Sequence, residues 1–261
     1  LSFAENLDTF AKNLQDTQPT VFFAVPRIWT KFQMGILSKI PQEKLTKLLK
    51  TPVLSWVLKR KFKKALGLGK ARSIVSGAAP LQETQRTWFR KIGVPITNGY
   101  GMTENCAITT HLGDGIINKP GSVGLAQPGV TLKIDSESSE ILMRGPYVMK
   151  EYYKQPELTA EVIKEGWLHT GDQGHIDAEG FLFITGRVKD IFKTSKGKYI
   201  EPLVLEGFFG DVLEFEQICI AGLGLPQPIC LGVLSEIGLA KPKDELQQYF
   251  SDYLENCLLY T

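Results

Sequence analysis

The stretch from Glu165 to Lys198 constrains the fold of this chain more than any other. Trp167 and Leu168 are an apolar pair leading into His-Thr-Gly-Asp, which predicts a polar turn at 169–172. Residues 177–180 predict a second turn, in which Gly180 takes a positive φ. Residues 181–184 are apolar throughout, which predicts a short buried strand interrupted by Thr-Gly at 185–186.

Two charged side chains in this stretch have chemistry that suits a nucleotide. The carboxylate of Asp172 can accept hydrogen bonds from a vicinal diol, as the acidic residue of dinucleotide folds does from ribose. The guanidinium of Arg187 offers a fixed fork of donors to phosphate or sugar oxygens. From these residues alone two interpretations stay open: a site for a nucleotide sugar, or a β-hairpin whose polar residues only cap its turns.

GWLHTGD at 166–172, followed by a turn and by GRVKD at 186–190, resembles the adenylate-forming superfamily of acyl-CoA synthetases, and its fatty-acyl members most of all. The resemblance implies ATP-dependent activation of a carboxylic acid to an acyl-adenylate, followed by thioester formation with coenzyme A. The implied protein is a ligase, a long-chain fatty acid–CoA ligase.

Composition argues against several other classes of protein. A hydrophobic content of 43% and a charged content of 22% are ordinary for a soluble globular protein, and a net charge of +2 gives no reason to expect a nucleic-acid partner. The four cysteines show no CxxC pairing and no histidine at metal-ligand spacing, which favours a reducing cytoplasm. No basic region precedes an apolar core at the start, so no signal peptide is expected. The longest uncharged run, 217–235, contains Gly and Pro, which predicts two buried strands around a turn rather than a membrane span.

The beginning of the chain predicts a helix, a strand and a second helix. Apolar residues at helical spacing predict a helix over 3–15, and residues 20–25 read as a buried strand. Pro26 can open a helix that continues past Trp29. PTVFFAVPRIW at 19–29 again resembles the fatty-acyl synthetases, in which it lies near the acyl pocket. We nevertheless expect Trp29 to pack in the core rather than to touch a ligand.

Residues 59–72 carry seven basic side chains and no acidic one. Such a run predicts the solvated face of a helix. The alternative is a contact with a membrane surface or with the phosphates of coenzyme A.

Two loops follow predicted strands and offer groups that suit ATP. After the strand at 72–76, small residues let a flat ring approach the backbone; they are Gly77, Ala78, Ala79 and Pro80. In the turn at 98–104, Tyr100 offers an aromatic face, Thr103 a hydroxyl and Glu104 a carboxylate, and oxygen ligands suit a triphosphate and its Mg²⁺. Alone, the turn could be an ordinary strand-to-helix corner. Between GAAP and GWLHTGD it matches the superfamily's adenine- and metal-binding motif.

The fold class is predicted to be α/β, with part of a large N-terminal domain followed by a truncated α+β domain. By resemblance, residues 1–120 form the C-terminal part of the α/β adenylate-binding subdomain, residues 121–187 a β-rich distorted barrel, and residues 188–261 a partial small domain. Alternation at 130–134 and at 140–144 predicts two strands in the β-rich part, and a helix is predicted near 243–259.

The resemblance implies a role for each matched residue. The adenine slot is formed by Gly77, Ala78, Ala79, Pro80, Tyr100 and Gly101. Thr103 contacts phosphate, and Glu104 holds Mg²⁺. Asp172 binds the ribose hydroxyls, and Arg187 binds the ribose or the α-phosphate side. Lys189 is the hinge of the small domain, and Gly197 with Lys198 approaches the coenzyme A tunnel after the swing.

The implied ligands are fatty acid, ATP, Mg²⁺ and coenzyme A. None of His111, His169 and His175 is needed as a base, and His169 is expected to order its turn. Localisation is predicted to be cytoplasmic with a peripheral membrane contact as an option, and the oligomeric state is unknown.

The sequence departs from the superfamily's pattern in two places. It contains neither the Ser/Thr/Gly-rich phosphate loop that ends in Lys nor a GxxxxGK[ST] substitute, and the C-terminal catalytic Lys has no counterpart. We therefore expect an internal fragment that is inactive alone. Two alternatives stay open: a fatty acyl-AMP ligase that passes the acyl group to a carrier protein, and a non-catalytic nucleotide-binding remnant.

Overall fold

The structure is a computed structural model that describes residues 6, 9–79, 81–110, 119–209, 212 and 214–258. The chain is mixed α/β, as predicted, and divides into two compact units. The first comprises Leu1–Asp135, Ile141–Thr170 and His175–Ile184, and the second comprises Ser136–Glu140, Gly171–Gly174 and Thr185–Thr261. The predicted borders after residues 120 and 187 stay predictions.

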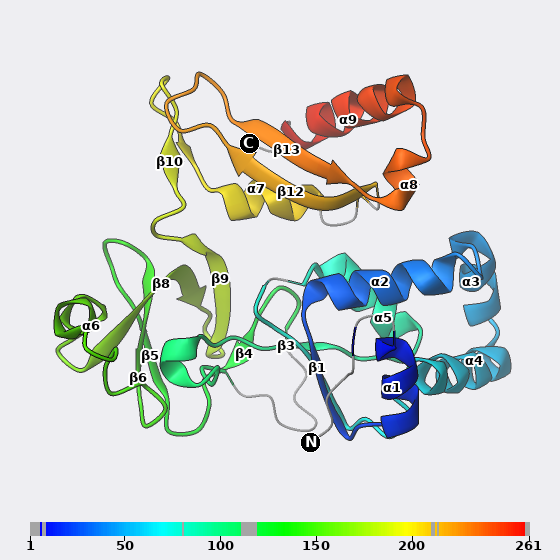
Figure 1. Cartoon of the computed structure of the whole chain (residues 1–261), viewed down its shortest axis with the longest axis horizontal. Helices are drawn as coiled ribbons and strands as arrows, with labels where there is room; N and C mark the ends of the chain where they lie inside the picture. Colours follow the sequence, from blue (N-terminus) through cyan, green and yellow to red (C-terminus); the bar gives the residue numbers. More distant parts are fainter. Residues whose placement is uncertain are drawn as a thin grey trace. The chain divides into compact units, whose positions relative to one another are not determined.

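The first unit contains a parallel sheet of three strands, in the order β1-β2-β3 (Figure 1). The strands are β1 (Val21–Ala24), β2 (Ser73–Ser76) and β3 (Thr97–Asn98). Helices precede and connect them, as parallel pairing requires: α1 (Phe10–Thr17), α2 (Pro26–Leu37), α3 (Gln42–Leu49), α4 (Pro52–Ala65) and α5 (Glu83–Lys91). Pro26 stands in the first turn of α2, where its missing N–H breaks no helical hydrogen bond.

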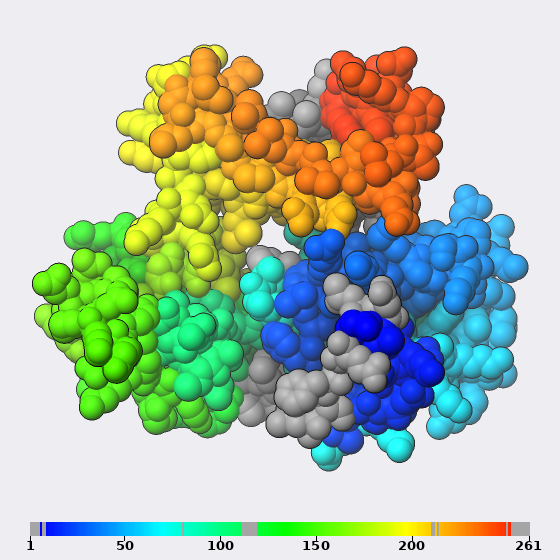
Figure 2. Space-filling model, in the orientation of Figure 1, coloured from blue at the N-terminus to red at the C-terminus, as the bar shows by residue number. Residues whose placement is uncertain are grey.

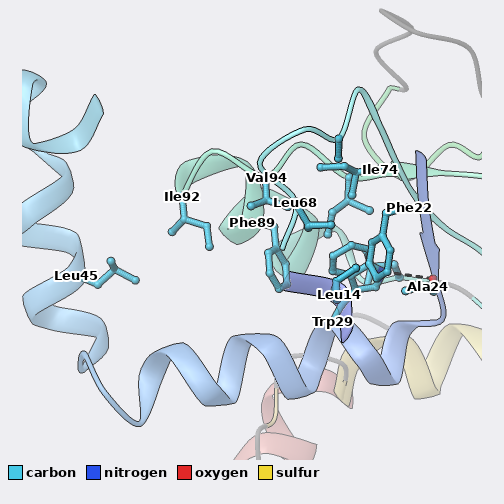
Figure 3. Packing of buried hydrophobic residues seen from close by; sticks show 13 residues of the cluster. Leu14, Phe22, Ala24, Trp29, Leu45, Leu68, Ile74, Phe89, Ile92 and Val94 are labelled. Carbon is cyan, nitrogen blue, oxygen red and sulfur yellow. Dashed lines mark hydrogen bonds between the residues drawn. The ribbon is translucent and has the colours of Figure 1, made fainter. Parts of the chain in front are cut away.

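One hydrophobic core joins these helices to one face of the sheet (Figure 3). Trp29 is fully buried, and its Nε1 donates a hydrogen bond to the carbonyl of Ala24 at 3.3 Å. Phe22 and Phe89 meet its ring edge to face, each with centroids 5.5 Å away. The prediction that Trp29 packs in the core is confirmed.

The prediction that residues 20–25 form a buried strand is only half right. Phe22 and Ala24 point into the core, whereas Val21 is 62% exposed and Phe23 is 55% exposed. Successive strand residues face opposite sides, so the described residues cover only one side of β1.

A second, six-stranded sheet has the order β4-β9-β8-β6-β5, with β7 paired to β8. Its strands are β4 (Gly124–Leu125), β5 (Thr131–Ile134), β6 (Glu140–Arg144), β7 (Ile163–Lys164), β8 (Trp167–Ile176) and β9 (Phe181–Arg187), with α6 (Pro156–Val162) ahead of β7. The strands predicted at 130–134 and 140–144 are therefore confirmed as β5 and β6.

Two predictions in this sheet are wrong. Residues 169–172 are not a turn but part of β8, so His169 has no turn to order. β9 is not interrupted at Thr-Gly and continues to Arg187. The turn at 177–180 is confirmed: the Asp177 Oδ1 accepts hydrogen bonds from the N–H groups of Glu179 and Phe181, and Gly180 has φ +89.

The C-terminal segment of the second unit forms its own small core from Phe209, Val212 and Ile220. Its elements are β10 (Phe192–Lys193), β11 (Tyr199–Ile200), α7 (Pro202–Phe208), β12 (Phe215–Ala221), β13 (Ile229–Leu234), α8 (Glu236–Leu239) and α9 (Lys243–Leu258). The two strands predicted within 217–235 exist as an antiparallel hairpin, but of their residues only Ile220 is buried. Leu231 of β13 is 56% exposed, and the orange atoms of this hairpin lie at the surface in Figure 2. Within the residues described here, no helix is both long and apolar enough to cross a bilayer.

Candidate functional site

The small-residue loop begins where β2 ends. Gly77 is buried, and a Cβ added to it would stand 2.9 Å from Cε2 of Phe23 and 3.3 Å from the carbonyl oxygen of Gly99, so a larger residue would require the Phe23 ring to move. Ala78 has φ +67 and is exposed together with Ala79. The predicted fourth member, Pro80, lies outside the described residues.

A buried hydroxyl directly precedes this loop. Ser76 is 1% exposed, and its Oγ has no hydrogen-bond partner among the described residues. An unsatisfied buried polar atom costs free energy unless a ligand or water satisfies it. Its place at the end of β2, beside exposed Ala78 and Ala79, suits the polar edge of a flat ring, so these residues fit an adenine.

The second predicted loop lies next to the first, because β2 and β3 are parallel neighbours that end at the same edge. The N–H of Gly99 donates to the carbonyl of Ser76 at 2.8 Å. Within this loop Tyr100 is half-buried and Thr103 is exposed. The structure therefore brings the residues predicted at 77–79 and at 100–104 to one edge of the sheet.

Asn105, which sequence reasoning missed, organises this corner. It is fully buried; its Oδ1 accepts from the N–H of Met102 at 2.9 Å, and its Nδ2 donates to Oγ1 of Thr109 at 2.7 Å and to Sδ of Met143 at 3.1 Å. The corner is thereby fixed to β6 through Met143. Asn105 is the last residue of η1 (Thr103–Asn105), so these bonds also fix this short helix.

The predicted metal ligand Glu104 is held by a tyrosine. The hydroxyl of Tyr152 donates a hydrogen bond to Oε1 of Glu104 at 2.7 Å, and the carbonyl of Glu104 accepts from the N–H of Met149 at 2.7 Å. This hydrogen bond, followed by partial burial and the negative charge of Glu104, raises the pKa of Tyr152 to about 12. Tyr152 was not predicted. It lies 48 residues from Glu104 in the sequence, and no motif indicates that the two side chains meet.

Glu104 can offer a carboxylate oxygen to a cation at this corner. Among the described residues no group of three His, Cys, Asp or Glu side chains could hold a metal ion. Mg²⁺ usually keeps several waters and uses one or two carboxylates together with substrate phosphates. A single oriented carboxylate therefore fits Mg²⁺ that arrives with a nucleotide.

The raised pKa of Tyr152 gives a testable pH dependence. Because the folded protein favours the neutral phenol, the contribution of Tyr152 to stability is fully present below pH 10 and is lost as pH rises towards 12. Ultraviolet absorbance can be followed as a function of pH in the parent and in Tyr152→Phe. The difference between the two curves reports ionisation of Tyr152 and should have its midpoint at about pH 12. In a Glu104→Gln background the same difference should shift towards pH 10, and a parent midpoint near 10 would contradict the contact.

In the second unit, Asp172 and Arg187 form an ion pair. Asp172 is 8% exposed, and its Oδ1 lies 3.1 Å from Nε of Arg187, whose side chain is 67% exposed. Gly171 has φ +73, and its N–H donates to Oε1 of Glu140 at 2.8 Å while its carbonyl accepts from Val188 at 2.9 Å. The backbone directly before the buried carboxylate is thus fixed, and an acceptor and a donor fork lie together as a sugar and its phosphate would need.

The remaining predicted residues lie elsewhere in the second unit. Lys189 is exposed in the turn after β9, where Asp190 N–H donates to the carbonyl of Arg187 at 3.2 Å. Gly197, with φ +84, and exposed Lys198 form the turn between β10 and β11, in which Thr194 Oγ1 accepts from the N–H of Lys198 at 3.1 Å. The ion pair and the hairpin are separate features of this unit.

The family profile described as AMP-binding enzyme matches residues 2–153, more than half of the chain. The chain belongs to this family. The matched residues include the loop at 77–79 and the neighbouring loop with η1, which lie at one edge of the sheet.

Curated relatives of this family member include fatty-acid ligases. The chain is 36% identical over 232 residues to a putative fatty-acid–CoA ligase, fadD11, of Mycobacterium tuberculosis, covering 76% of this chain and 40% of the relative. It is 30% identical over 245 residues to long chain acyl-CoA synthetase 4 of Arabidopsis thaliana, covering 81% of this chain and 37% of the relative. The chain therefore spans about 40% of the length of these relatives.

Solved structures agree on the fold. An anthranilate CoA ligase in complex with anthranoyl-AMP matches 95% of this chain with a TM-score of 0.70 at 22% identity, covering 45% of that structure. The ATP-bound RpMatB-BxBclM chimera B1 matches 94% of this chain with a TM-score of 0.67 at 26% identity, covering 46% of that structure. The predicted resemblance to adenylate-forming acyl-CoA synthetases is confirmed.

Proposed function

We propose that this family member supplies nucleotide-binding residues to an ATP-dependent long-chain fatty acid–CoA ligase. The observation that carries the proposal is the Asp172–Arg187 pair, in which a buried carboxylate lies 3.1 Å from an exposed guanidinium. The fatty-acid ligases among its relatives support this substrate class.

The proposed reaction has two steps that balance without a protein nucleophile. A carboxylate oxygen of the fatty acid attacks the α-phosphorus of ATP, and pyrophosphate leaves. The thiol of coenzyme A then attacks the acyl carbon, its proton is lost, and AMP leaves. Catalysis here is positioning and charge neutralisation.

Each group of residues has a place in this scheme. The exposed loop at 77–79 and Tyr100 bind the adenine, Thr103 contacts phosphate, and Asp172 with Arg187 binds the ribose and the α-phosphate side. When bound, Mg²⁺ would be held by Glu104 and would neutralise phosphate charge. Tyr152 positions the Glu104 carboxylate and touches no substrate in this proposal.

AMP binding by Asp172→Ala tests the nucleotide assignment. A charge-assisted hydrogen bond is worth on the order of 1.5–3 kcal/mol, so calorimetry should show AMP affinity falling roughly ten- to hundred-fold. The parent should bind AMP more tightly than its 2′- and 3′-deoxy forms, and the variant should discriminate less.

Asp190→Ala is the matched control, because it removes an exposed carboxylate from the same unit. Substitutions of exposed residues usually change free energy by no more than about 0.5 kcal/mol. Asp190→Ala should therefore leave AMP affinity within about two-fold of the parent. Unchanged discrimination against the deoxy forms in Asp172→Ala would show that Asp172 does not contact the ribose.

A separate experiment on the full-length protein tests which molecule accepts the acyl group. With ATP and a long-chain fatty acid, acyl-CoA should form when coenzyme A is added. Acyl transfer only to a carrier protein would favour the acyl-AMP ligase alternative, and AMP binding without any adenylate would favour the non-catalytic alternative.

This chain of 261 residues contains no phosphate loop, so we expect no ATP–pyrophosphate exchange from it alone.

The hinge assignment of Lys189 predicts separable half-reactions in that protein. Proline at 189 fixes φ near −65° and would oppose the backbone change that a domain swing needs. Thioester output should therefore collapse while acyl-adenylate accumulates, because Asp172 and Arg187 precede the hinge and Gly197 and Lys198 follow it. Lys189→Ala, which keeps the backbone free, should retain both steps, and equal loss of both in the proline variant at unchanged stability would remove the assignment.

A cytoplasmic location with a peripheral membrane contact remains part of this proposal. Its support is the basic run, whose residues on α4 are mostly exposed. Sedimentation with vesicles, described below, tests the contact.

A further inference from the structure

A cavity in the first unit is lined by residues of α3, α4 and α5 and of the segments that adjoin these helices. Its volume is about 280 Å³, just below the range of about 300–1,000 Å³ typical of small-molecule sites. Its apolar lining includes Leu45, Leu49, Trp88 and Ile92. Leu45 points from α3 towards Ile92, and both are almost fully buried (Figure 3). None of the residues assigned to the nucleotide lines it.

Three lysine residues also line the cavity. Lys50 follows α3, Lys59 lies on α4 and Lys91 ends α5, and no acidic residue lines the cavity. Within the described part of the chain, none of the three forms an ion pair. Three positive charges on the lining of one cavity, without an acidic residue among them, attract an anion.

The position of Lys59 is fixed by its neighbour Gly93. Gly93 has φ +86, and a Cβ there would come 2.7 Å from Cβ of Lys59. The missing side chain of Gly93 therefore leaves room for the aliphatic stem of Lys59 to pack beside it. A larger residue at 93 would push this lysine away from the cavity.

A serine in the lining offers a further hydroxyl. Ser55 is 8% exposed, and its hydroxyl makes no hydrogen bond to any other described residue, not even to the carbonyl of Thr51 one turn earlier. Nearby, Nε1 of Trp88 donates to Oε1 of Gln42 at 2.8 Å, which ties α5 to α3. The cavity thus has a rigid aromatic wall and an unused polar group.

We propose that this cavity binds a phosphate monoester on a hydrocarbon chain. The phosphate accepts from the ammonium groups of Lys50, Lys59 and Lys91 and from the hydroxyl of Ser55, and the first part of the chain packs on Leu45, Leu49 and Trp88. A phosphate monoester carries up to two negative charges and three acceptor oxygens, which suits three cations better than a single carboxylate does.

The ligand could reach the cavity free in solution or from a bilayer that contains phosphatidate. On α4 the adjoining residues Val53 and Trp56 are 76% and 60% exposed, which would suit a membrane surface. The experiment therefore has one arm for each source.

Calorimetry on the whole chain with decyl phosphate tests the soluble source. Decyl phosphate should bind saturably, inorganic phosphate should bind at least about ten-fold more weakly for want of an apolar chain, and decanol should bind more weakly for want of charge. Decanol binding as tightly as decyl phosphate, or no saturable binding of either, would overturn the proposal.

Two charge-reversal variants locate the binding. In the Lys50→Glu, Lys91→Glu variant, which changes exposed side chains and should fold, affinity for decyl phosphate should fall roughly ten-fold or more. The control Lys61→Glu, Lys64→Glu changes charge equally on exposed positions of α4 outside the cavity, and should keep affinity within about two-fold. Equal loss in both variants would show a general charge effect and overturn the site, as would no loss in the first.

Vesicles of phosphatidylcholine with and without phosphatidate form the second arm. Phosphatidate-dependent sedimentation of the parent, lost in the Lys50→Glu, Lys91→Glu variant and kept in the control, identifies the bilayer as a source. Binding of decyl phosphate without such sedimentation identifies a free phosphate monoester. Failure of this cavity to bind would leave AMP binding, which uses other residues, unaffected.

Discussion

Trp29→Ala is expected to lower the free energy of unfolding by about 3–5 kcal/mol. The side chain is fully buried, and its indole contacts Phe22, Phe32 and Phe89 edge to face, with centroids 5.5 to 5.9 Å away. Alanine would leave a cavity lined by these rings and would free the carbonyl of Ala24 from its hydrogen bond. Urea unfolding followed by circular dichroism measures the loss.

Trp56→Ala is the matched control, because it removes the same side chain from an exposed place. Trp56 is 60% exposed and contacts the guanidinium of Arg60, whose Cζ lies 4.6 Å from the ring centroid. Such a contact at the surface is worth about 0.5–1 kcal/mol, so the control should lose no more than about 1 kcal/mol. Similar losses in both variants would mean that Trp29 is not the centre of this core.

Gly101→Ala is expected to destabilise the protein by about 1–3 kcal/mol and to displace η1. An added Cβ would stand 2.5 Å from Cα of Ala107 and closer still to its carbonyl. These are backbone atoms, and the N–H of Ala107 is bonded to the carbonyl of Met102 at 2.8 Å, so the whole corner must move. Glu104 would move with it, and the pKa of Tyr152 should fall from about 12 towards 10 as their hydrogen bond weakens.

Gly35→Ala separates this effect from the general effect of adding a methyl group. Gly35 lies inside α2, and a Cβ there would meet nothing within 4 Å. Alanine should raise stability by up to about 1 kcal/mol and leave the pKa of Tyr152 unchanged. A neutral effect of Gly101→Ala would show that the corner is looser than the geometry indicates.

Local chemistry allowed the sequence to predict some features correctly. Pro26 opens α2 and Gly180 takes a positive φ because single residues decide these conformations. Trp29 was predicted to be buried because a large apolar side chain near the start of a helix gains most free energy by packing in the core. Asp172 and Arg187 were predicted as one site, and the structure pairs them in the second unit.

Features that depend on distant neighbours could not be predicted. Tyr152 reaches Glu104 only because the chain folds α6 and the segment before it beside η1. Polar residues at 169–172 read as a turn, yet β8 continues through them because neighbouring strands satisfy its backbone. The exposed side of β1 and the exposed hairpin β12–β13 show the same limit, since apolar composition does not tell which side a chain covers.

The exposed side of β1 affects how the purified chain should associate in solution. In the described sheet β1 is an edge strand, and Val21 and Phe23 present apolar surface beside unpaired backbone groups. Such edges favour pairing with another chain. Purified alone, the chain should self-associate as its concentration rises, and Phe23→Lys, on the exposed side, should keep it dispersed at concentrations where the parent scatters light.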